Sequence, residues 1–234
     1  MDTEPETRVK LAEHLDRYII ADDVTVEDVT DTTAEIAVEG PRAEAALRGM
    51  GVTEVPSEAD AWLGWGARMI ARVAAAGAGG FRIFTSLADK AGLLAALADL
   101  PQASPEDART VRIENGRPRY GEEITERYLL QETAQMQGVS FTKGCYLGQE
   151  IVERVRSRGL VHRVLCRLEI DSAEVPEAGT KLKLGDADAA EIASAAFSPA
   201  LGKVVALAYV RLPHNQPGVE LSLDGAPARV SLIS

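Results

Sequence analysis

The sequence contains few cysteines, few aromatic residues and no long hydrophobic run. Its two cysteines, Cys145 and Cys166, are too few for a disulfide framework and lack the CxxC spacing of a zinc or cluster site, so we predict no bound metal. No apolar stretch approaches the roughly 20 residues that span a bilayer. The polar N-terminus, MDTEPETRVK, is neither a signal nor a transit peptide. These absences predict a protein of a reducing cytoplasm with no membrane partner.

Basic residues are also in the minority. The 234 residues include 36 acidic and 25 basic side chains, for a net charge of −11 and a pI near 4.9. Such a chain does not hold nucleic acid by neutralising phosphates, so we expect no direct DNA binding. The apolar content of 46% excludes a disordered chain. The length predicts one or two domains with a substantial core.

The charge is unevenly distributed along the chain. Residues 1–60 contain 16 acidic and five basic side chains, a balance that equals the net charge of the whole chain. Residues 143–168 instead contain six basic and two acidic side chains. This basic island in an acidic chain is a candidate site for an anionic ligand.

Hydrophobic periodicity in the first hundred residues predicts an α+β layer. Leu11, Leu15 and Ile19 lie on one face of a helix. Alternating apolar residues predict strands, which we place at 24–29, 33–39, 68–74 and 81–85. Two further helices are predicted, one over 41–50 and one over 86–100. The result is an antiparallel sheet with helices on one side.

The rest of the chain divides into a connector, a charged segment and a set of short strands. Residues 101–110 are polar and contain two prolines, which is typical of a domain boundary. Periodicity is weak over 111–162, which suits a site built from loops. Six alternating runs follow from Arg163, separated by Gly, Pro or Asp at about ten-residue spacing. They predict a small antiparallel barrel or sandwich.

Cys145 lies in the segment FTKGCYLGQEIVERVRSRG, residues 141–159. Gly144 and Gly148 permit sharp turns and a close approach to a ligand, and Lys143 favours the thiolate over the thiol. The alternative is a small buried hydrophobe, which the local sequence alone favours. Cys166, in the alternating run VLCRL, is predicted to be a core residue.

Two further groups are candidate ligand contacts. Arg154, Arg156 and Arg158 alternate, so they would project from one face of an extended segment and bind a carboxylate or phosphate. The alternative is a solvated strand edge protected by its charge. Glu114, in RIENGRPRYG, would accept two hydrogen bonds from a heterocycle such as a pterin, or else flank a surface hairpin. Spacing does not decide between these alternatives.

The string KGCYLGQE, residues 143–150, resembles the signature of the YgfZ-type folate-binding proteins, which are related to the glycine-cleavage T-protein, an aminomethyltransferase. Similarity extends to LDRYIIADDVTVEDVT, VEGPRA, RIENGRPRYG and SAAFSPALGKVVALAYVR. The resemblance implies a T-protein-like fold whose parts, a C-terminal β-barrel among them, surround a central hole that holds folate. It also implies a role in iron–sulfur cluster assembly or repair, with iron–sulfur enzymes or assembly proteins as partners.

The resemblance implies roles for single residues. Cys145 would be the catalytic, reactive group, and Lys143 would lower its pKa or contact the folate. Five residues would shape or hold the loop around the thiol, namely Gly144, Tyr146, Gly148, Gln149 and Glu150.

A tetrahydrofolate-type cofactor is implied in the same way. Glu114 would bind the pterin, with Tyr120 as a further contact. Arg154, Arg156 and Arg158 would attract the glutamyl carboxylates of folate or an acidic partner. The leading hypothesis is therefore a folate-binding protein that supports iron–sulfur enzymes. The alternatives are a folate-dependent aminomethyl or methyl transferase and a non-catalytic interaction module.

The chain departs from the family in two places. By the resemblance, the chain would begin after the N-terminal segment that completes the folate-binding domain and that in true T-proteins supplies the catalytic aspartate, and Asp22 and Asp23 would not replace that aspartate. Residues 61–73, AWLGWGARMIARV, match nothing in the family. The predicted parts are an acidic tail at 1–8, a ferredoxin-like α+β layer at 9–100, a folate-site segment at 101–162 and the barrel at 163–234.

Overall fold

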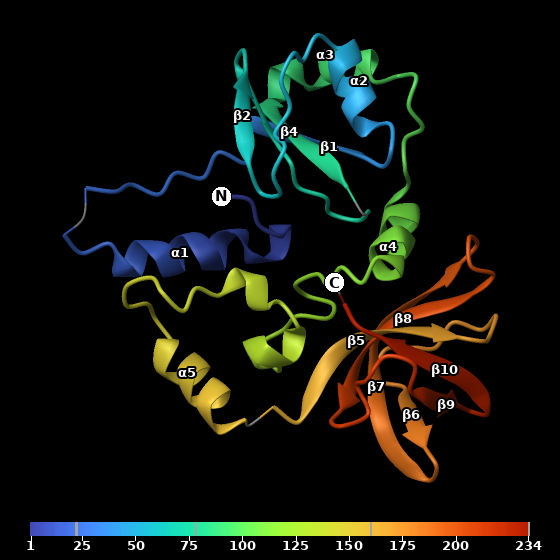
Figure 1. Ribbon diagram of the computed structural model, residues 1–234. Helices are drawn as coiled ribbons and strands as arrows, with labels where there is room; N and C mark the ends of the chain where they lie inside the picture. The colour runs from blue at the N-terminus through green and yellow to red at the C-terminus, as the bar shows by residue number, and fades with distance from the viewer. Residues whose placement is uncertain (22, 78, 160, 234) are drawn as a thin grey trace. The chain divides into compact units, whose positions relative to one another are not determined.

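A computed structural model describes residues 1–21, 23–77, 79–159 and 161–233. The chain forms two units, Met1–Gln102 and Ala103–Ser234, each with its own core (Figure 1). The division between them falls inside the predicted polar connector.

The N-terminal helix of the first unit forms as predicted, but its apolar face stays outside the core. The helix α1 spans Arg8–Tyr18, after a short 3-10 turn, η1, at Pro5–Thr7, and none of its residues is buried. The strand predicted at 24–29 is wrong, because this stretch is exposed and forms no strand; Val24, for example, is 57% exposed. Alternation produces a strand only where a neighbouring strand takes up the backbone hydrogen bonds.

The first unit is built on a four-stranded antiparallel sheet in the order β1-β4-β3-β2. The strands are β1 (Thr33–Glu39), β2 (Trp62–Trp65), β3 (Arg68–Ala71) and β4 (Gly80–Ser86). Against the sheet pack α2 (Ala43–Gly49) and α3 (Lys90–Ala96), the latter preceded by the 3-10 turn η2 (Leu87–Asp89). Leu47 and Leu93 from the two helices meet Ile36, Ile70 and Ile83 of the sheet in the core. The predicted α+β layer, with helices on one side of the sheet, is confirmed.

Two details of this sheet differ from the prediction. The strand β2 was missed, because Gly64 and two tryptophans interrupt the alternation there. The ferredoxin-like element order is also wrong. In that order a helix follows the third strand, whereas here β2, β3 and β4 follow one another and each pairs antiparallel with the next. Because β3 and β4 are antiparallel neighbours, no helical crossover is needed between them.

The second unit opens with a helix inside the predicted connector. The helix α4 spans Pro105–Glu114, and Ser104 caps it: its hydroxyl accepts the Asp107 N–H at 3.0 Å, while the Asp107 carboxylate accepts the Ser104 N–H at 3.1 Å. The bond from the Ser104 hydroxyl lowers the pKa of the Asp107 carboxyl. Residues 111–162, expected as loops, also contain η3 (Leu130–Thr133), η4 (Met136–Gly138) and α5 (Gln149–Arg158).

The six alternating runs form a closed antiparallel barrel in the order β10-β5-β8-β7-β6-β9, as predicted. Its strands are β5 (Arg163–Ile170), β6 (Lys181–Leu184), β7 (Ala187–Ser198), β8 (Lys203–Arg211), β9 (Glu220–Leu223) and β10 (Ala226–Ser231). The central strand β8 is buried on both faces. One face lines the barrel core. The other, with Leu207 and Tyr209, packs against Ile113 of α4, which therefore lies on the outside of the barrel (Figure 1).

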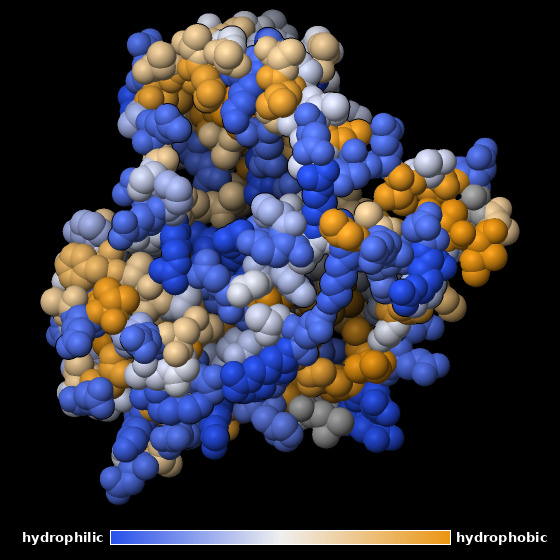
Figure 2. Space-filling model, turned by 180° about the vertical axis from the view of Figure 1, so that it is seen from behind, coloured by the Kyte–Doolittle hydropathy of each residue, from blue (hydrophilic) through white to orange (hydrophobic). Residues whose placement is uncertain are grey.

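Figure 2 shows hydrophobic side chains in separate patches among hydrophilic ones on one face of the molecule. The large exposed apolar side chains of the second unit include Phe141, Leu147 and Ile151, on either side of Cys145 in the sequence. Among the described residues, no helix combines the length and the apolar character that crossing a membrane requires.

Candidate functional site

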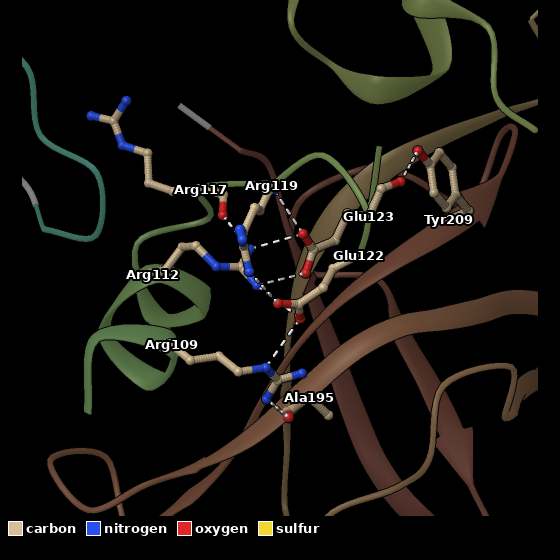
Figure 3. Close-up of polar contacts among 8 residues, drawn as sticks. All are labelled: Arg109, Arg112, Arg117, Arg119, Glu122, Glu123, Ala195 and Tyr209. Atoms are coloured by element: carbon tan, nitrogen blue, oxygen red, sulfur yellow. Dashed lines mark hydrogen bonds and ion pairs between the residues drawn. The ribbon is translucent and has the colours of Figure 1, made fainter. Parts of the chain in front are cut away.

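A buried network joins α4 to the turn that follows it (Figure 3). Arg112 of α4 is 7% exposed and Glu123 is 0% exposed. Arg112 Nη1 and Nη2 lie 2.8 and 3.1 Å from the two carboxylate oxygens of Glu123, which is a bidentate ion pair. The Arg119 N–H donates to the same carboxylate at 2.8 Å, and Arg112 donates to the Arg117 carbonyl at 2.6 Å. Residues 117–123 are thereby fastened to α4.

The same network reaches the barrel. Glu122 pairs with Arg109 and Arg112, each at 3.0 Å, and Arg109 donates to the Ala195 carbonyl of β7 at 2.9 Å. The Tyr209 hydroxyl of β8 donates to the Glu123 carbonyl at 2.8 Å, and burial raises the pKa of that hydroxyl. We did not predict this network from the sequence. The sequence contains one indication of it: Arg109 and Arg112 are three residues apart, which puts both on one face of α4.

Glu114 is the last residue of α4, so the hairpin alternative for this segment is wrong. Its carbonyl accepts a hydrogen bond from Arg167 Nε of β5 at 2.6 Å. Its side chain is half-buried, and no described residue forms a hydrogen bond or ion pair with its carboxylate. Gly116, with a φ of +66°, turns the chain away two residues later. Both carboxylate oxygens of Glu114 are therefore open to accept hydrogen bonds.

Cys145 is exposed in the loop that leads into α5, so the alternative of a buried hydrophobe is wrong. Gly148, with a φ of +86°, is the N-cap of that helix. The Tyr146 N–H donates to the Gln149 side-chain oxygen at 3.0 Å, which holds the loop against the first helical turn. Lys143 Nζ lies 4.8 Å from the centroid of the Tyr146 ring, a cation–π contact.

Gly144 and Glu150 of the loop are less constrained. The backbone of Gly144 lies outside the left-handed region, and a Cβ there would meet no atom within 4 Å. Glu150 is exposed in the first turn of α5, where a negative charge is favourable beside the helix dipole. Its carboxylate forms no hydrogen bond or ion pair within the described residues. The roles of these two residues in shaping and holding the loop stay predictions.

The arginine row expected on an extended segment lies on the helix α5 instead. Successive residues of a helix are about 100° apart, so residues two positions apart face different sides, and the one-faced row is wrong. Arg156 pairs with Glu153 at 3.3 Å, and its guanidinium lies 4.3 Å from the Phe141 ring centroid. Arg154 and Arg158, four residues apart, share another face.

A chain of hydrogen bonds connects α5 to the barrel. The Gln131 side-chain amide in η3 donates to the Val152 carbonyl of α5 at 3.0 Å. The carboxylate of the buried Glu132 accepts the Leu129 N–H and Arg163 Nε, each at 3.0 Å. Arg163 is the first residue of β5. Through η3, the start of the barrel therefore positions the helix that follows Cys145.

A stacked pair of tyrosines also contacts Arg163, where η3 meets the start of the barrel. Tyr128 stacks on Tyr209 with ring centroids 3.7 Å apart and planes 12° apart. The Arg163 guanidinium lies 4.9 and 5.5 Å from the two ring centroids. These contacts, together with the ion pair to Glu132, hold Arg163 on several sides.

The predicted site residues form two sets in the second unit. Glu114 and Tyr120 lie at the end of α4 and in the turn after it, whereas Lys143 and Cys145 lie in the loop before α5. Over the part of the chain that the structure describes, no hydrogen bond, ion pair or ring contact joins one set to the other. Tyr120 is 38% exposed and forms a backbone bridge with Ile124. One set offers a carboxylate and the other a thiol.

The two cysteines are expected to differ sharply toward thiol reagents. Cys166 is fully buried in β5, as predicted, and burial raises the pKa of its thiol to about 11. We expect only the exposed Cys145 to react with dithionitrobenzoate in the native protein, and both cysteines to react in guanidinium chloride. The Cys145→Ala protein is the control and should not react until it unfolds. Rapid reaction of both thiols in the native protein would contradict the burial of Cys166.

The second unit and the whole chain each match known proteins. Residues 163–232, which cover all six barrel strands, match the family model of the glycine cleavage T-protein C-terminal barrel domain. The chain also has a TM-score of 0.83 with the crystal structure of the glycine cleavage system aminomethyltransferase T from Bartonella henselae, at 19% identity. That match covers 97% of this chain and 66% of the other. The fold is T-protein-like.

Aminomethyltransferases are also found among its relatives in sequence. The one from Saccharopolyspora erythraea is 33% identical over 229 residues, 92% of this chain and 61% of that protein. The one from Rubrobacter xylanophilus is 28% identical over 239 residues, 97% of this chain and 62% of that protein. The T-protein-like chain thus spans about three fifths of the length of these curated relatives. The T-protein-like part of the predicted resemblance is confirmed, while the YgfZ-type assignment and the roles of the site residues stay predictions.

Proposed function

We propose that this T-protein-like chain binds a reduced folate and, through Cys145, supports iron–sulfur enzymes. The observation that carries the folate part is the Glu114 carboxylate, which is half-buried and without a partner among the described residues. A pterin presents neighbouring N–H donors along one edge, which match the two acceptor oxygens of a single carboxylate. The residues present at the end of α4 therefore fit the pterin.

Further folate contacts are assigned to Tyr120 and Lys143. The exposed ring of Tyr120 offers a flat surface for stacking, and the exposed Lys143 offers a cation for a glutamyl carboxylate. Arg154 and Arg156 cannot act as one clamp, because they face different sides of α5 and Arg156 is already paired with Glu153. We therefore assign no joint folate role to these two arginines.

Cys145 carries the iron–sulfur part of the proposal. Its exposed thiol is accessible to a ligand or a protein partner, which a core cysteine is not. One thiol does not hold a cluster of its own, because clusters commonly take four cysteine ligands. The protein would thus act on iron–sulfur enzymes or assembly proteins rather than carry a cluster. This part of the proposal comes from the resemblance of residues 143–150 to the YgfZ-type signature.

The names of the relatives favour a second candidate, folate-dependent aminomethyl transfer. Both sequence relatives are called aminomethyltransferases. Such a transfer needs a positioned group that moves a proton at the folate nitrogen. Turnover of a folate one-carbon adduct by the purified protein would support this candidate. Retention of that turnover in Cys145→Ala would show that it does not depend on the thiol.

Folinic acid tests the folate part. At about 100 times its Kd, a ligand that binds only the folded state adds about 2.7 kcal/mol of stability, so we expect Tm to rise by several degrees. Glu114→Gln should remove most of that rise and leave the Tm of the free protein unchanged, because no described residue pairs with the Glu114 carboxylate. The exposed Glu106, on the same helix, gives the matched control Glu106→Gln, which should keep the rise.

The opposite outcome of that experiment is equally informative. No rise in the Tm of the unmodified protein at saturating folinic acid would contradict folate binding and favour an interaction module. A rise that Glu114→Gln leaves intact would show that the ligand binds elsewhere.

A further inference from the structure

One face of α5 presents apolar and cationic side chains to solvent. Ile151, Arg154 and Arg158 follow one another on a single face of the helix, and Leu147 lies in the turn just before the N-cap Gly148. Leu147 is 67% exposed and Ile151 is 52% exposed, and both arginines are exposed as well. Neither guanidinium has an ion-pair partner within the described residues. This α5 face is apolar at its N-terminal end and cationic at its C-terminal end.

The rest of α5 already has partners. Val155, four residues after Ile151 and at the edge of this face, is buried, and the Val152 carbonyl accepts the hydrogen bond from Gln131 of η3. Arg156 is paired with Glu153 and lies over Phe141. The helix is therefore fixed to the second unit through these contacts, while the α5 face stays open.

We propose that the α5 face docks an acidic amphipathic helix of a partner protein. The spacing of three and then four residues from Ile151 to Arg158 is the pattern that one helix presents to another. Burial of Leu147 and Ile151 would supply the apolar centre of the contact. Carboxylates of the partner would pair with Arg154 and Arg158, whose planar guanidinium groups suit bidentate pairing.

The arrangement favours an antiparallel partner. Arg154 and Arg158 lie in the C-terminal half of α5. In an antiparallel pair, the carboxylates that meet them would lie near the N-terminus of the partner helix. Acidic residues near a helix N-terminus and basic residues near a C-terminus both interact favourably with the helix dipoles. A membrane surface fits less well, because two apolar side chains make a much smaller apolar face than interfacial helices bury.

The α5 face lies close to Cys145 in the sequence, so docking would bring a partner protein near the thiol. Leu147 is two residues from the exposed thiol in the sequence. A protein bound along α5 would therefore lie next to the Cys145 loop. This link to the thiol rests on the proposed function, whereas the docking itself depends on neither Cys145 nor folate.

A designed peptide tests the docking directly. The probe is a fluorescein-labelled helical peptide of about 18 residues with two Glu and then two Leu on one face, at the spacing that antiparallel pairing needs. Its control peptide carries Lys in place of the two Glu. We expect the full-length protein to bind the acidic peptide in fluorescence anisotropy, more weakly as salt is added, and to bind the Lys peptide at least about tenfold more weakly.

Variants of the protein locate the binding. Reversing both charges of the face, with Arg154→Glu and Arg158→Glu, should weaken binding of the acidic peptide at least about tenfold. The matched control is Arg42→Glu with Lys90→Glu, which reverses two exposed charges of the first unit and should leave binding unchanged. The milder pair Arg154→Gln and Arg158→Gln serves if charge reversal disturbs folding. Glu114→Gln and Cys145→Ala should bind the peptide normally, which separates docking from the proposed function.

Several results would overturn the proposal. One is equal binding of the acidic and Lys peptides, and another is unchanged binding after charge reversal. Displacement of the peptide by folinic acid would assign the arginines to folate instead. A dimer that Ile151→Glu dissociates would show that a second copy covers the face. Tighter binding to phosphatidylglycerol vesicles than to the peptide, lost on the same charge reversal, would assign the face to a membrane.

Discussion

Cys145→Ala is expected to abolish the support of iron–sulfur enzymes while leaving the fold intact. In cells that depend on this protein, the activity of a radical S-adenosylmethionine enzyme should fall to the level seen without the protein. The loss would be complete because no neighbouring residue offers a second thiol: the other cysteine, Cys166, is fully buried in β5. Cys145 is exposed in a loop, so its substitution should change the free energy of unfolding by no more than about 0.5 kcal/mol.

Two further variants make this experiment decisive. Cys145→Ser keeps the size of the side chain and removes the thiol chemistry, so it should be as inactive as the alanine variant. Cys166→Ala removes the buried cysteine, at a modest cost in stability, and should keep the activity. Undiminished enzyme activity with Cys145→Ala would contradict the iron–sulfur proposal and leave folate-dependent transfer as the better candidate.

The second large effect concerns stability. Removing one partner of the buried pair, by Arg112→Leu or Glu123→Leu, is expected to lower the free energy of unfolding of the second unit by about 3–5 kcal/mol. In Arg112→Leu the fully buried Glu123 carboxylate would lose its guanidinium, whereas in Glu123→Leu Arg112 keeps its ion pair with Glu122. Arg112→Leu should therefore be the more damaging of the two, although Glu123→Leu also leaves the Arg119 N–H without its acceptor. Native proteins have free energies of unfolding of about 5–15 kcal/mol, so this change would remove much of the stability of the second unit.

The measurement must follow the second unit specifically. Both tryptophans lie in the first unit, so their fluorescence does not report on the barrel. Hydrogen exchange of the β8 amides during denaturation reports the barrel directly. The double variant Arg112→Leu with Glu123→Leu should be more stable than Arg112→Leu, because the buried carboxylate that lost its guanidinium is then also removed. A loss below about 1 kcal/mol for both single variants would show that the pair is well solvated.

Arg109→Gln is a useful matched substitution on the same helix. Arg109 pairs with Glu122 at 3.0 Å as Arg112 does, but its side chain is 40% exposed whereas that of Arg112 is 8% exposed. Exposed ion pairs contribute about 0–1 kcal/mol. Comparing the loss of stability on replacing Arg109 with the loss on replacing Arg112 would therefore measure how much of the loss comes from burial rather than from the ion pair.

The barrel was the part of the fold most easily predicted from the sequence. Most barrel strands alternate apolar and polar residues, β8 is apolar from Val204 to Val210, and Gly, Pro or Asp separates the runs, so these signals are local. The same signals identified β1, β3 and β4 of the first unit. They failed for β2, where Gly64 replaces a side chain of the pattern, and at 24–29, where the alternation has no neighbouring strand.

The candidate site was predicted less well than the fold. The motif KGCYLGQE directed attention to the loop around Cys145, but the local sequence favoured a buried thiol, and the structure exposes it. The three arginines after the loop alternate as on a strand, yet Gly148 caps a helix just before them, and the helix separates them onto different faces. Local periodicity cannot distinguish these cases when the segment is short and polar.

The sequence by itself determined the order of the strands along the chain, the T-protein-like resemblance and the thiol-bearing motif. These depend on residues close together in the chain, whose spacing sets which side chains share a face. Only the tertiary structure decided which charges are buried and which remain free. The Glu123 carbonyl meets Tyr209 across 86 residues, and Arg163 meets Glu132 across 31. Burial depends on such distant contacts, so no local pattern revealed the Arg112–Glu123 pair or the open face of α5.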